Sequence, residues 1–442
     1  MKIYISGISG TGMGPLALMA LKAGHEVYGS DLTKGAIYDE LLEAGVDVMI
    51  GEQDGEFLRA KLLEGVDWFV YTSALPEDHT ELMIARSAGV KISKRDELTA
   101  FLVKELGLKM VAVAGTHGKT TTTAMIVWGA IKLGLPVSYV VGTTLGFAPS
   151  GAYHAGDKYF VYEADEYDRN FLKFHPWLAV ITCVSYDHPD IYKTPEDYKR
   201  AFVEFEQQSE KVYGNSLTHV YVDGDPNSGP AFPDIELLLA GEARREDEWW
   251  ALVTLREIMI NEGLEVEDKK IADILNEFPG VGRRFERLID GVYTDYAHHP
   301  EEIMATIDVA LDECRMRGYK GVVAVYQPHQ NTRQHEVRDG YLHAFDGVKR
   351  VYWLPTYLTR ENLDLVVLTP EDLISDLANR GVAEPANLDD ELFGKLMKWR
   401  DDGYLILLMT AGPADGWLRN KVRASNLLWD AYKKSQSGGV ES

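Results

Sequence analysis

The sequence has 442 residues, 45% of them apolar, so it is long enough for about three domains with buried cores. Its 69 Asp and Glu outnumber its 45 Lys and Arg, and this acidity disfavours sequence-independent binding to nucleic acid or to an anionic membrane. No apolar stretch has the length of a membrane span, and we expect no signal peptide because the N-terminal residues are themselves strand-like. We therefore expect a cytoplasmic protein without nucleic-acid or membrane partners. The sequence leaves open whether it is a monomer or a homodimer. The two cysteines, Cys183 and Cys314, argue against a disulfide framework, and Cys183 is expected in a core because its neighbours are apolar.

The first segment alternates short apolar runs with helix-like stretches, a pattern typical of an α/β domain. Strands are predicted at Lys2–Ser6, Glu26–Gly29 and Trp68–Tyr71, and a helix at Pro15–Ala23. A glycine-rich turn, Gly7 to Gly14, follows the first strand, and Asp31 follows the second. This order suits a nucleotide pyrophosphate on the turn with its ribose on the acid. Such a turn can also merely pack a helix closely on a sheet, and it also fits an NAD-dependent oxidoreductase.

A linker is expected at Leu102–Lys109, and the second segment then opens with a glycine loop. The apolar run Met110–Ala114 enters this loop and a helix-like stretch, Thr120–Leu133, leaves it. Glycines let backbone N–H groups turn inward, Lys119 adds a point charge, and Thr120 offers a hydroxyl to Mg²⁺. Val113 stands where the usual phosphate-loop pattern has its first glycine, so this is a variant loop. The alternative, a plain glycine turn before a surface helix, leaves the Lys-Thr-Thr sequence without a purpose.

Two further predicted strands end in residues that suit a metal ion. Tyr159–Tyr162 runs into Glu163, and Leu178–Val184 leads to His188. The carboxyl ends of parallel strands meet at one edge of a sheet, where a metal-bound triphosphate belongs in an α/β fold. Each residue alone has a simpler explanation, a salt bridge for the acid and a loop position for the histidine. Together with the glycine loop they favour a metal site.

The third segment predicts another doubly wound sheet after a boundary at Gly280–Glu286, which carries Arg284. Arginine forks suit a phosphoryl group that gains charge during transfer, although a surface pair with glutamate is nearly as good an explanation. Strands are predicted at Val292–Thr294, Val322–Tyr326, Val351–Leu354 and Tyr404–Met409. A helix follows Pro300, and the polar loop Gln327–Arg333 follows the second of these strands.

Four motifs in order resemble those of the Mur ligase family: Gly115–Thr121, Glu163–Glu166, Asp187–Asp190 and Asp295–Pro300. The resemblance implies an α/β chain of three domains. These are a Rossmann-like UDP-sugar domain (1–105), a central ATP-binding domain with a P-loop ATPase-like parallel sheet (106–286), and a Rossmann-like amino-acid domain (287–442). It also implies an ATP- and Mg²⁺-dependent ligase of peptidoglycan precursor synthesis. Such a ligase joins the carboxylate of UDP-N-acetylmuramate to a small amino acid, here expected to be L-alanine, through an acyl phosphate.

The same resemblance implies roles for individual residues. The UDP moiety would be held by Gly7, Gly10, Gly12, Met13, Asp31 and Ser73. ATP would be bound by Gly115, Thr116, His117, Gly118, Lys119, Thr120, Thr121, Asp295 and His298. Magnesium would be held by Thr120, Glu163 and His188, and catalysis would depend on Lys119, Glu163, His188 and Arg284. The amino acid would be positioned by His329 and Arg333.

Two departures from the family pattern keep alternatives open. Gln330 stands where the family usually has arginine, which removes one fork for an amino-acid carboxylate. The central domain is shortened after Asp225, and the asparagines that read adenine are missing, with Asp247 and Trp250 roughly in their place. A ligase that adds a tripeptide in cell-wall recycling is therefore an alternative, and so is a nucleotide-binding relative without catalysis.

Overall fold

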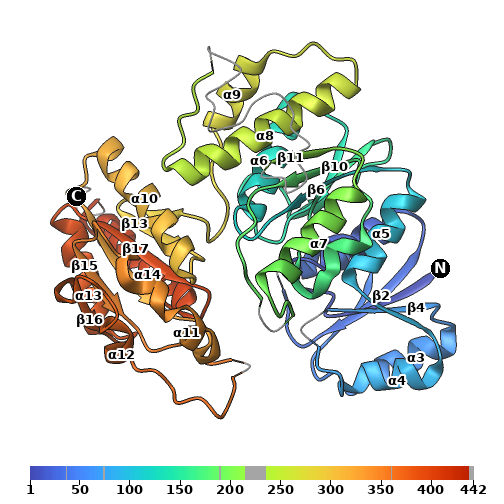
Figure 1. Cartoon of the computed structure of the whole chain (residues 1–442). Helices are drawn as coiled ribbons and strands as arrows, with labels where there is room; N and C mark the ends of the chain where they lie inside the picture. The colour runs from blue at the N-terminus through green and yellow to red at the C-terminus, as the bar shows by residue number, and fades with distance from the viewer. Residues whose placement is uncertain (36, 73–74, 189–190, 215–234, 360, 438–442) are drawn as a thin grey trace. The chain divides into compact units, whose positions relative to one another are not determined.

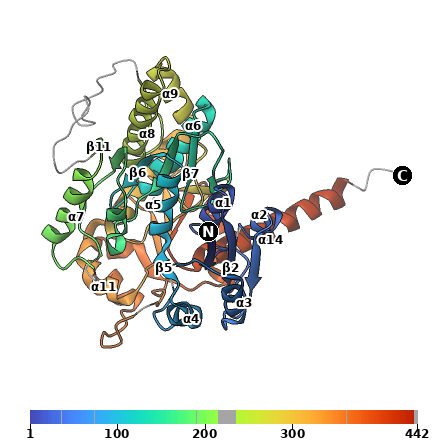
Figure 2. The same ribbon diagram turned by 90° about the vertical axis from the view of Figure 1, so that its right-hand side faces the viewer.

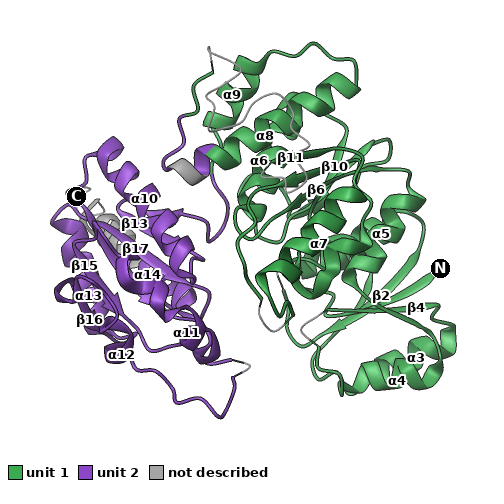
Figure 3. Ribbon diagram, viewed as in Figure 1, with its two compact units in different colours: residues 1–237, 246–279 green, residues 238–245, 280–442 purple. Residues whose placement is uncertain are grey.

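The computed structural model describes residues 1–35, 37–72, 75–188, 191–214, 235–359 and 361–437. This part of the chain forms two compact units, Met1–Leu237 with Glu246–Pro279 and Leu238–Arg245 with Gly280–Ser442 (Figure 3). Both units are of the α/β class, as predicted, and each sheet is mainly parallel. Among the described residues, no helix combines the length and the apolar character needed to cross a membrane.

The first sheet belongs to unit 1 and forms the N-terminal part of the chain (Figure 1). Its elements are β1 (Lys2–Ser6), α1 (Gly14–Lys22), β2 (Glu26–Asp31), α2 (Tyr38–Glu43), β3 (Asp47–Ile50), α3 (Glu56–Glu64), β4 (Trp68–Tyr71), α4 (Thr80–Ala88), β5 (Lys91–Lys94) and α5 (Arg95–Glu105). The strand order β3-β2-β1-β4-β5 is parallel throughout. The central strand β1 is buried on both faces, which explains the apolar run Ile3–Ile5 at its centre. Helices α3 and α4 pack side by side at one end of the unit.

The second sheet also lies in unit 1 and carries the predicted phosphate loop. Its elements are β6 (Lys109–Ala114), α6 (Lys119–Leu133), β7 (Val137–Val140), β8 (Gly151–Ala152), β9 (Tyr159–Glu163), η1 (Tyr167–Lys173), β10 (Leu178–Ile181), α7 (Pro195–Gln207), β11 (Val212–Gly214), α8 (Glu242–Asn261) and α9 (Asp268–Asn276). The order is β11-β10-β6-β9-β7-β8, with only β8 antiparallel to its neighbour. Strands β10, β6 and β9 are adjacent, so their carboxyl ends share one edge.

Two local predictions in unit 1 differ from the structure. The linker expected at Leu102–Lys109 is shorter, because α5 continues to Glu105 and Leu102 is fully buried. Apolar residues on the inner face of this helix make it part of the first domain's core. The region around Asp225, where the sequence indicates a shortened domain, lies outside the described residues.

The third sheet forms unit 2. Its elements are β12 (Glu286–Ile289), β13 (Val292–Asp295), α10 (Pro300–Arg317), β14 (Val322–Gln327), α11 (Asn331–Val337), η2 (Arg338–His343), β15 (Arg350–Trp353), α12 (Pro370–Ile374), η3 (Arg380–Val382), β16 (Ala383–Pro385), α13 (Asp390–Asp401), β17 (Leu405–Thr410) and α14 (Ala414–Ser437). The order is β12-β13-β17-β14-β15-β16, with β12 antiparallel. His299 and Glu302 form a capping box at the start of α10, and Gly318 ends this helix with a φ of +77°. Figure 2 shows the long helix α14 extending past the sheet of its own unit.

Candidate active site

The loop between β6 and α6 has the backbone of a phosphate cradle. Gly115 has a φ of +139° and Gly118 a φ of +82°, conformations that disfavour any other residue. A Cβ on Gly115 would also collide with Thr182, at the end of β10. The backbone N–H of Thr116 donates to the Cys183 carbonyl at 3.0 Å. The glycines are therefore required because the loop is held tightly against the neighbouring strand end.

Cys183 belongs to this loop contact rather than to the core, which corrects the expectation from its apolar neighbours. Strand β10 ends at Ile181, two residues before the cysteine, and Cys183 is only partly buried. Its Sγ accepts a hydrogen bond from the His117 backbone N–H at 3.2 Å. Burial raises the pKa of the Cys183 thiol to about 11, so it stays protonated at neutral pH.

Lys119, Glu166 and His188 form a buried cluster beside the loop. Lys119 Nζ donates to Glu166 Oε2 at 2.8 Å and to the Gly115 carbonyl at 2.5 Å. His188 Nε2 lies 3.5 Å from Glu166 Oε1, and the Glu166 side chain is 1% exposed. The structure thus brings together two of the predicted catalytic residues through an acid that the sequence analysis left without a role. Glu166 stands three residues after Glu163 in the same motif, and this position in the sequence could have indicated that it belongs to the site.

The electrostatics of this cluster favour ionised forms. Burial by itself would lower the pKa of Lys119, but Glu166 and then Asp165 raise it above its ordinary value. Burial would raise the pKa of Glu166, but Lys119 and His188 lower it to about 2. Burial also opposes protonation of His188, yet the hydrogen bond to Glu166 and the charge of Asp187 raise its pKa. Glu166 is therefore a carboxylate held between the Lys119 ammonium and the His188 imidazole.

Thr120 and Glu163 form a second pair at the same edge. The Thr120 hydroxyl donates to Glu163 Oε1 at 2.7 Å, and the Gly142 backbone N–H lies 3.3 Å from Glu163 Oε2. A hydroxyl and a carboxylate oxygen are the hard ligands that Mg²⁺ accepts. The donor set therefore fits a magnesium ion, with Lys119 at the adjacent position of the loop.

Several residues next to the cluster have a strained backbone. His188 has a φ of +58°, and Asp168 and Arg169 have consecutive values of +54° and +56° inside η1. Left-handed conformations of residues other than glycine cost free energy and occur preferentially at functional sites. Arg169 pairs with Asp197 of α7 at 2.7 Å, which helps to hold η1 in this conformation.

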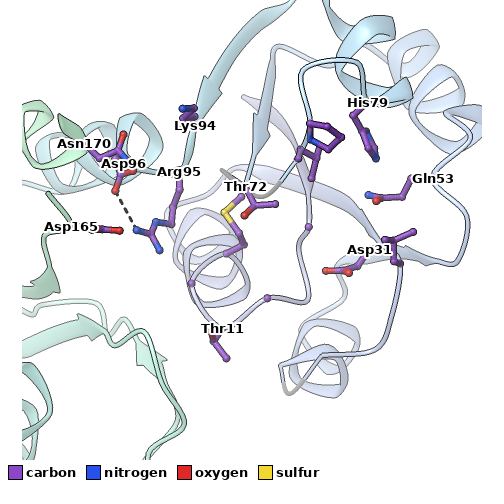
Figure 4. Close-up of a pocket in the computed structure, with 17 residues that line it drawn as sticks. Thr11, Asp31, Gln53, Thr72, His79, Lys94, Arg95, Asp96, Asp165 and Asn170 are labelled. Atoms are coloured by element: carbon purple, nitrogen blue, oxygen red, sulfur yellow. Dashed lines mark ion pairs between the residues drawn. The ribbon is translucent and has the colours of Figure 1, made fainter. Parts of the chain in front are cut away.

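A pocket of about 480 Å³ lies at the carboxyl edge of the first sheet (Figure 4). Its lining includes most of the residues predicted to hold a UDP moiety, namely Gly7, Gly10, Gly12, Met13 and Asp31. The remaining one, Ser73, lies outside the described residues. The pocket also contains Gln53, His79, Lys94, Arg95 and Asn170, which the sequence analysis did not select. These residues come from loops and element ends that carry no glycine-rich signature.

The predicted residues of the third segment lie in unit 2, at the carboxyl ends of its strands. The Asp295 carboxylate accepts from the backbone N–H of Phe285 at 2.6 Å and of Ala297 at 2.7 Å, so it organises its own loop. The rings of His298 and His329 have centroids 5.7 Å apart. The role of Asp295 and His298 in binding ATP stays a prediction.

Two cationic residues of unit 2 complete this set. The Arg284 guanidinium lies over the ring of Tyr296, 5.1 Å from its centroid. Arg333 lies in α11, the helix that follows His329. The structure therefore groups Arg284 with the loop after β13 and Arg333 with the loop after β14.

Together, the cradle, the buried lysine and the strand-end ligands define an enzyme that uses a nucleoside triphosphate. Two family models match the sequence: the Mur ligase family catalytic domain over residues 2–105, and the Mur ligase middle domain over residues 113–226. The chain belongs to the Mur ligase family of ATP-dependent acid–amino-acid ligases, which act in peptidoglycan precursor synthesis.

Individual relatives agree with this assignment. UDP-N-acetylmuramate--L-alanine ligase of Clostridium acetobutylicum is 30% identical, over 93% of this chain and 95% of that protein. The crystal structure of UDP-N-acetylmuramate-alanine ligase MurC from Thermotoga maritima matches with a TM-score of 0.74 at 22% identity, over 96% of this chain and 99% of that one. Murein peptide ligase from Psychrobacter arcticus matches with a TM-score of 0.60 at 20% identity, over 96% and 98%. The two structural matches show a shared fold.

Proposed function

We propose that this ligase joins the carboxylate of UDP-N-acetylmuramate to L-alanine and converts ATP to ADP and phosphate in the same reaction. The substrates are those named for the curated relatives that span nearly the whole chain. The observation that carries the proposal is the convergence of Lys119, Glu166 and His188 with Thr120 and Glu163 at three adjacent strand ends. A protein that only bound a nucleotide would have less use for ligands directed at a metal.

The residues of the central sheet suit magnesium triphosphate. Lys119 would bind the β- and γ-phosphates, Thr120 and Glu163 would hold one Mg²⁺, and His188 with Glu163 would hold a second. A bound Mg²⁺ would neutralise negative charge on the phosphates during transfer. Lys119 would exchange its contact with Glu166 for a contact with phosphate oxygens, and Glu166 would keep the ammonium over the loop until the nucleotide binds.

The reaction that we propose has two transfers. A carboxylate oxygen of the sugar attacks the γ-phosphorus of ATP, ADP leaves, and an acyl phosphate forms. The amine of the amino acid then attacks the acyl carbon, loses a proton, and displaces phosphate. Arg284 would contact the phosphoryl group, Asp295 and His298 would contact ATP, and His329 and Arg333 would position the amino acid.

The three-domain division of the reaction is part of the same proposal. Residues 1–105 would bind the UDP-sugar in the pocket beside the glycine turn, and residues 106–286 would bind ATP. Residues 287–442 would bind the amino acid. The presence of one sheet in each of these three stretches supports this division of roles. In every sheet, polar loops follow the carboxyl ends of the strands, where ligands bind in α/β folds.

Phosphate release tests the proposal directly. The chain is incubated with ATP, MgCl₂, UDP-N-acetylmuramate and single amino acids, and product formation is followed by mass spectrometry. We expect release only when the sugar nucleotide and L-alanine are both present. No release with any amino acid would refute the ligase assignment, and Lys119→Ala serves as the variant that should lose turnover.

A second candidate is a ligase that adds a peptide, and Gln330 is the observation that favours it. An arginine at this position would give an α-carboxylate a bidentate partner, and glutamine does not. Replacing L-alanine with the tripeptide L-Ala-γ-D-Glu-meso-diaminopimelate in the same assay separates the two functions. The amine acceptor with the larger kcat/KM identifies the reaction.

A further inference from the structure

Arg95 projects into the pocket of the first domain from the start of α5. Its guanidinium covers the glycine turn: a Cβ built on Gly12 would lie 2.6 Å from Arg95 Nη1. In Figure 4, the Arg95 side chain lies on the Asp165 side of the pocket, whereas Asp31 and Gln53 lie on the opposite side. The side chain is 28% exposed, so its polar end is open to the pocket. Arg95 thus lies directly above the turn that would receive a pyrophosphate.

The donors of Arg95 have no matching acceptor within the described residues. Its closest acid is Asp96, whose Oδ1 lies 3.6 Å from Nη2, beyond a hydrogen bond. Its other close neighbour is the ring of Tyr162, 5.7 Å from the guanidinium carbon. The adjacent cation, Lys94, is instead paired with Asp168. A half-buried guanidinium with unfilled donors indicates a ligand that brings acceptor oxygens.

The opposite side of the turn favours the same kind of ligand. Helix α1 follows the turn directly, and its first turn contains no acidic residue. The positive end of its helix dipole therefore favours an anion, while the backbone N–H groups of Met13 and Gly14 already donate to the Gly10 carbonyl. An anion on the turn would lie between the start of this helix and the guanidinium of Arg95, a side chain that can bind phosphate through two parallel hydrogen bonds.

We propose that Arg95 clamps the diphosphate of the sugar nucleotide against the glycine turn at Gly12. This assignment rests on the proposed function for the identity of the sugar, but it requires only a nucleoside diphosphate in the pocket. The acceptor carboxylate of the sugar is the other anionic group that an arginine fork would suit. Ligands that contain one group without the other distinguish the two.

Affinities of three ligands test the clamp. UDP and UDP-N-acetylglucosamine carry the diphosphate without the lactyl carboxylate, whereas UDP-N-acetylmuramate carries both. Arg95→Gln should weaken binding of all three by a similar factor, about 10- to 100-fold, as measured by isothermal titration calorimetry. Arg95→Lys should cause an intermediate loss of affinity, because lysine keeps the positive charge but cannot form two parallel hydrogen bonds. Arg86→Gln, which removes an arginine paired with Glu77 on α4, is the charge-matched control and should leave all three affinities unchanged.

Gly12→Ala provides an independent test, because the φ of Gly12 is not in the left-handed region and the three atoms nearest to an added Cβ all belong to the Arg95 side chain. Alone it should weaken UDP binding by displacing the guanidinium. In the Arg95→Gln background it should have little further effect, which is the coupling expected of a shared partner. Thermal denaturation of each variant checks that it is folded.

Several outcomes would overturn the clamp. These are an unchanged affinity of Arg95→Gln for UDP, a loss confined to UDP-N-acetylmuramate, or additive effects of the two substitutions. If the unmodified chain binds UDP but makes no amide with any acceptor, the proposed ligase function fails while the clamp is still decided by these affinities. If the unmodified chain binds neither UDP nor UDP-N-acetylglucosamine, the clamp fails, and the phosphate-release assay decides the ligase function separately.

Discussion

The carboxylate of Glu166 lies 2.8 Å from the ammonium of Lys119 and 3.5 Å from the imidazole of His188. A buried carboxylate between two basic groups is stabilising only while all three are present, because removing one leaves an uncompensated charge. Glu166→Gln keeps the shape of the side chain and removes its charge. We expect it to lower the free energy of unfolding by about 3–5 kcal/mol and to lower kcat by about 100-fold, measured by chemical denaturation and phosphate release.

The control for this variant is Glu77→Gln, which removes an exposed acid paired with Arg86. Its stability and activity should be those of the unmodified chain, because exposed ion pairs contribute little. Normal activity of Glu166→Gln would show that Lys119 does not depend on its buried partner.

The contact between Thr120 and Glu163 predicts a specific dependence on magnesium. Glu163→Gln should raise the Mg²⁺ concentration for half-maximal activity by about 10- to 100-fold, because an amide oxygen is a weaker ligand than a carboxylate. The measurement is a titration of MgCl₂ at saturating ATP and sugar nucleotide. Glu204→Gln, at an exposed position of α7, is the matched control. An unchanged magnesium requirement in Glu163→Gln would exclude Glu163 as a ligand.

Gln330 predicts how the amine site can be altered. This residue already has a φ of +61°, and its backbone N–H donates to the Tyr357 carbonyl at 2.9 Å, so Gln330→Arg keeps the backbone unchanged. If L-alanine binds here, the new fork should lower its KM by about 10-fold with kcat little changed. Gln330→Lys, which adds a charge without a fork, should have a smaller effect. A KM that does not respond to either substitution would place the α-carboxylate elsewhere.

Glu361 predicts a dependence of stability on pH. Burial would raise the pKa of Glu361, but hydrogen bonds from the backbone N–H groups of Thr359, Thr332 and Asn331 lower it below its ordinary value. A carboxyl with a lowered pKa stabilises the folded state above about pH 4.3, and this contribution is lost as the pH falls through the folded-state pKa. Thermal denaturation between about pH 6 and pH 3 should therefore show a smaller loss of stability for Glu361→Gln than for the unmodified chain. Parallel curves for the two proteins would contradict this.

Substitution of the buried residue Glu81 is predicted to reduce the stability of the fold. Glu81 is fully buried and accepts hydrogen bonds from Tyr4 at 2.6 Å, Ser6 at 2.6 Å and Ser30 at 2.7 Å. These serines directly precede the glycine turn and Asp31, so the carboxylate fixes two strand ends at the pocket. Glu81→Ala would leave several donors without an acceptor and should destabilise the fold by about 3–5 kcal/mol, measured by urea denaturation. Glu81→Gln should cost about 1–2 kcal/mol because an acceptor oxygen remains. Equal stability of the two variants would contradict this account.

The local elements of this chain follow closely from its sequence. The prediction of strands at Lys2–Ser6 and Trp68–Tyr71 is confirmed residue for residue, because buried parallel strands are uninterrupted apolar runs. The helix start predicted at Pro300 and the helix end predicted at Leu133 are also confirmed, because both are set by local residues. The glycine loop before Lys119 could be located because its backbone conformation depends on its own residues.

Contacts between distant segments were decided only by the tertiary structure. The motif around Glu163 contains Glu166, but only the fold makes Glu166 the partner of Lys119 across two neighbouring strands. Arg95 has no local signature, and it covers a turn that is far from it in the chain. Cys183 was expected in a core because its neighbours are apolar, but the strand ends before it. A short sequence pattern specifies the conformation of its own backbone, whereas the partner of a side chain depends on which strands lie side by side.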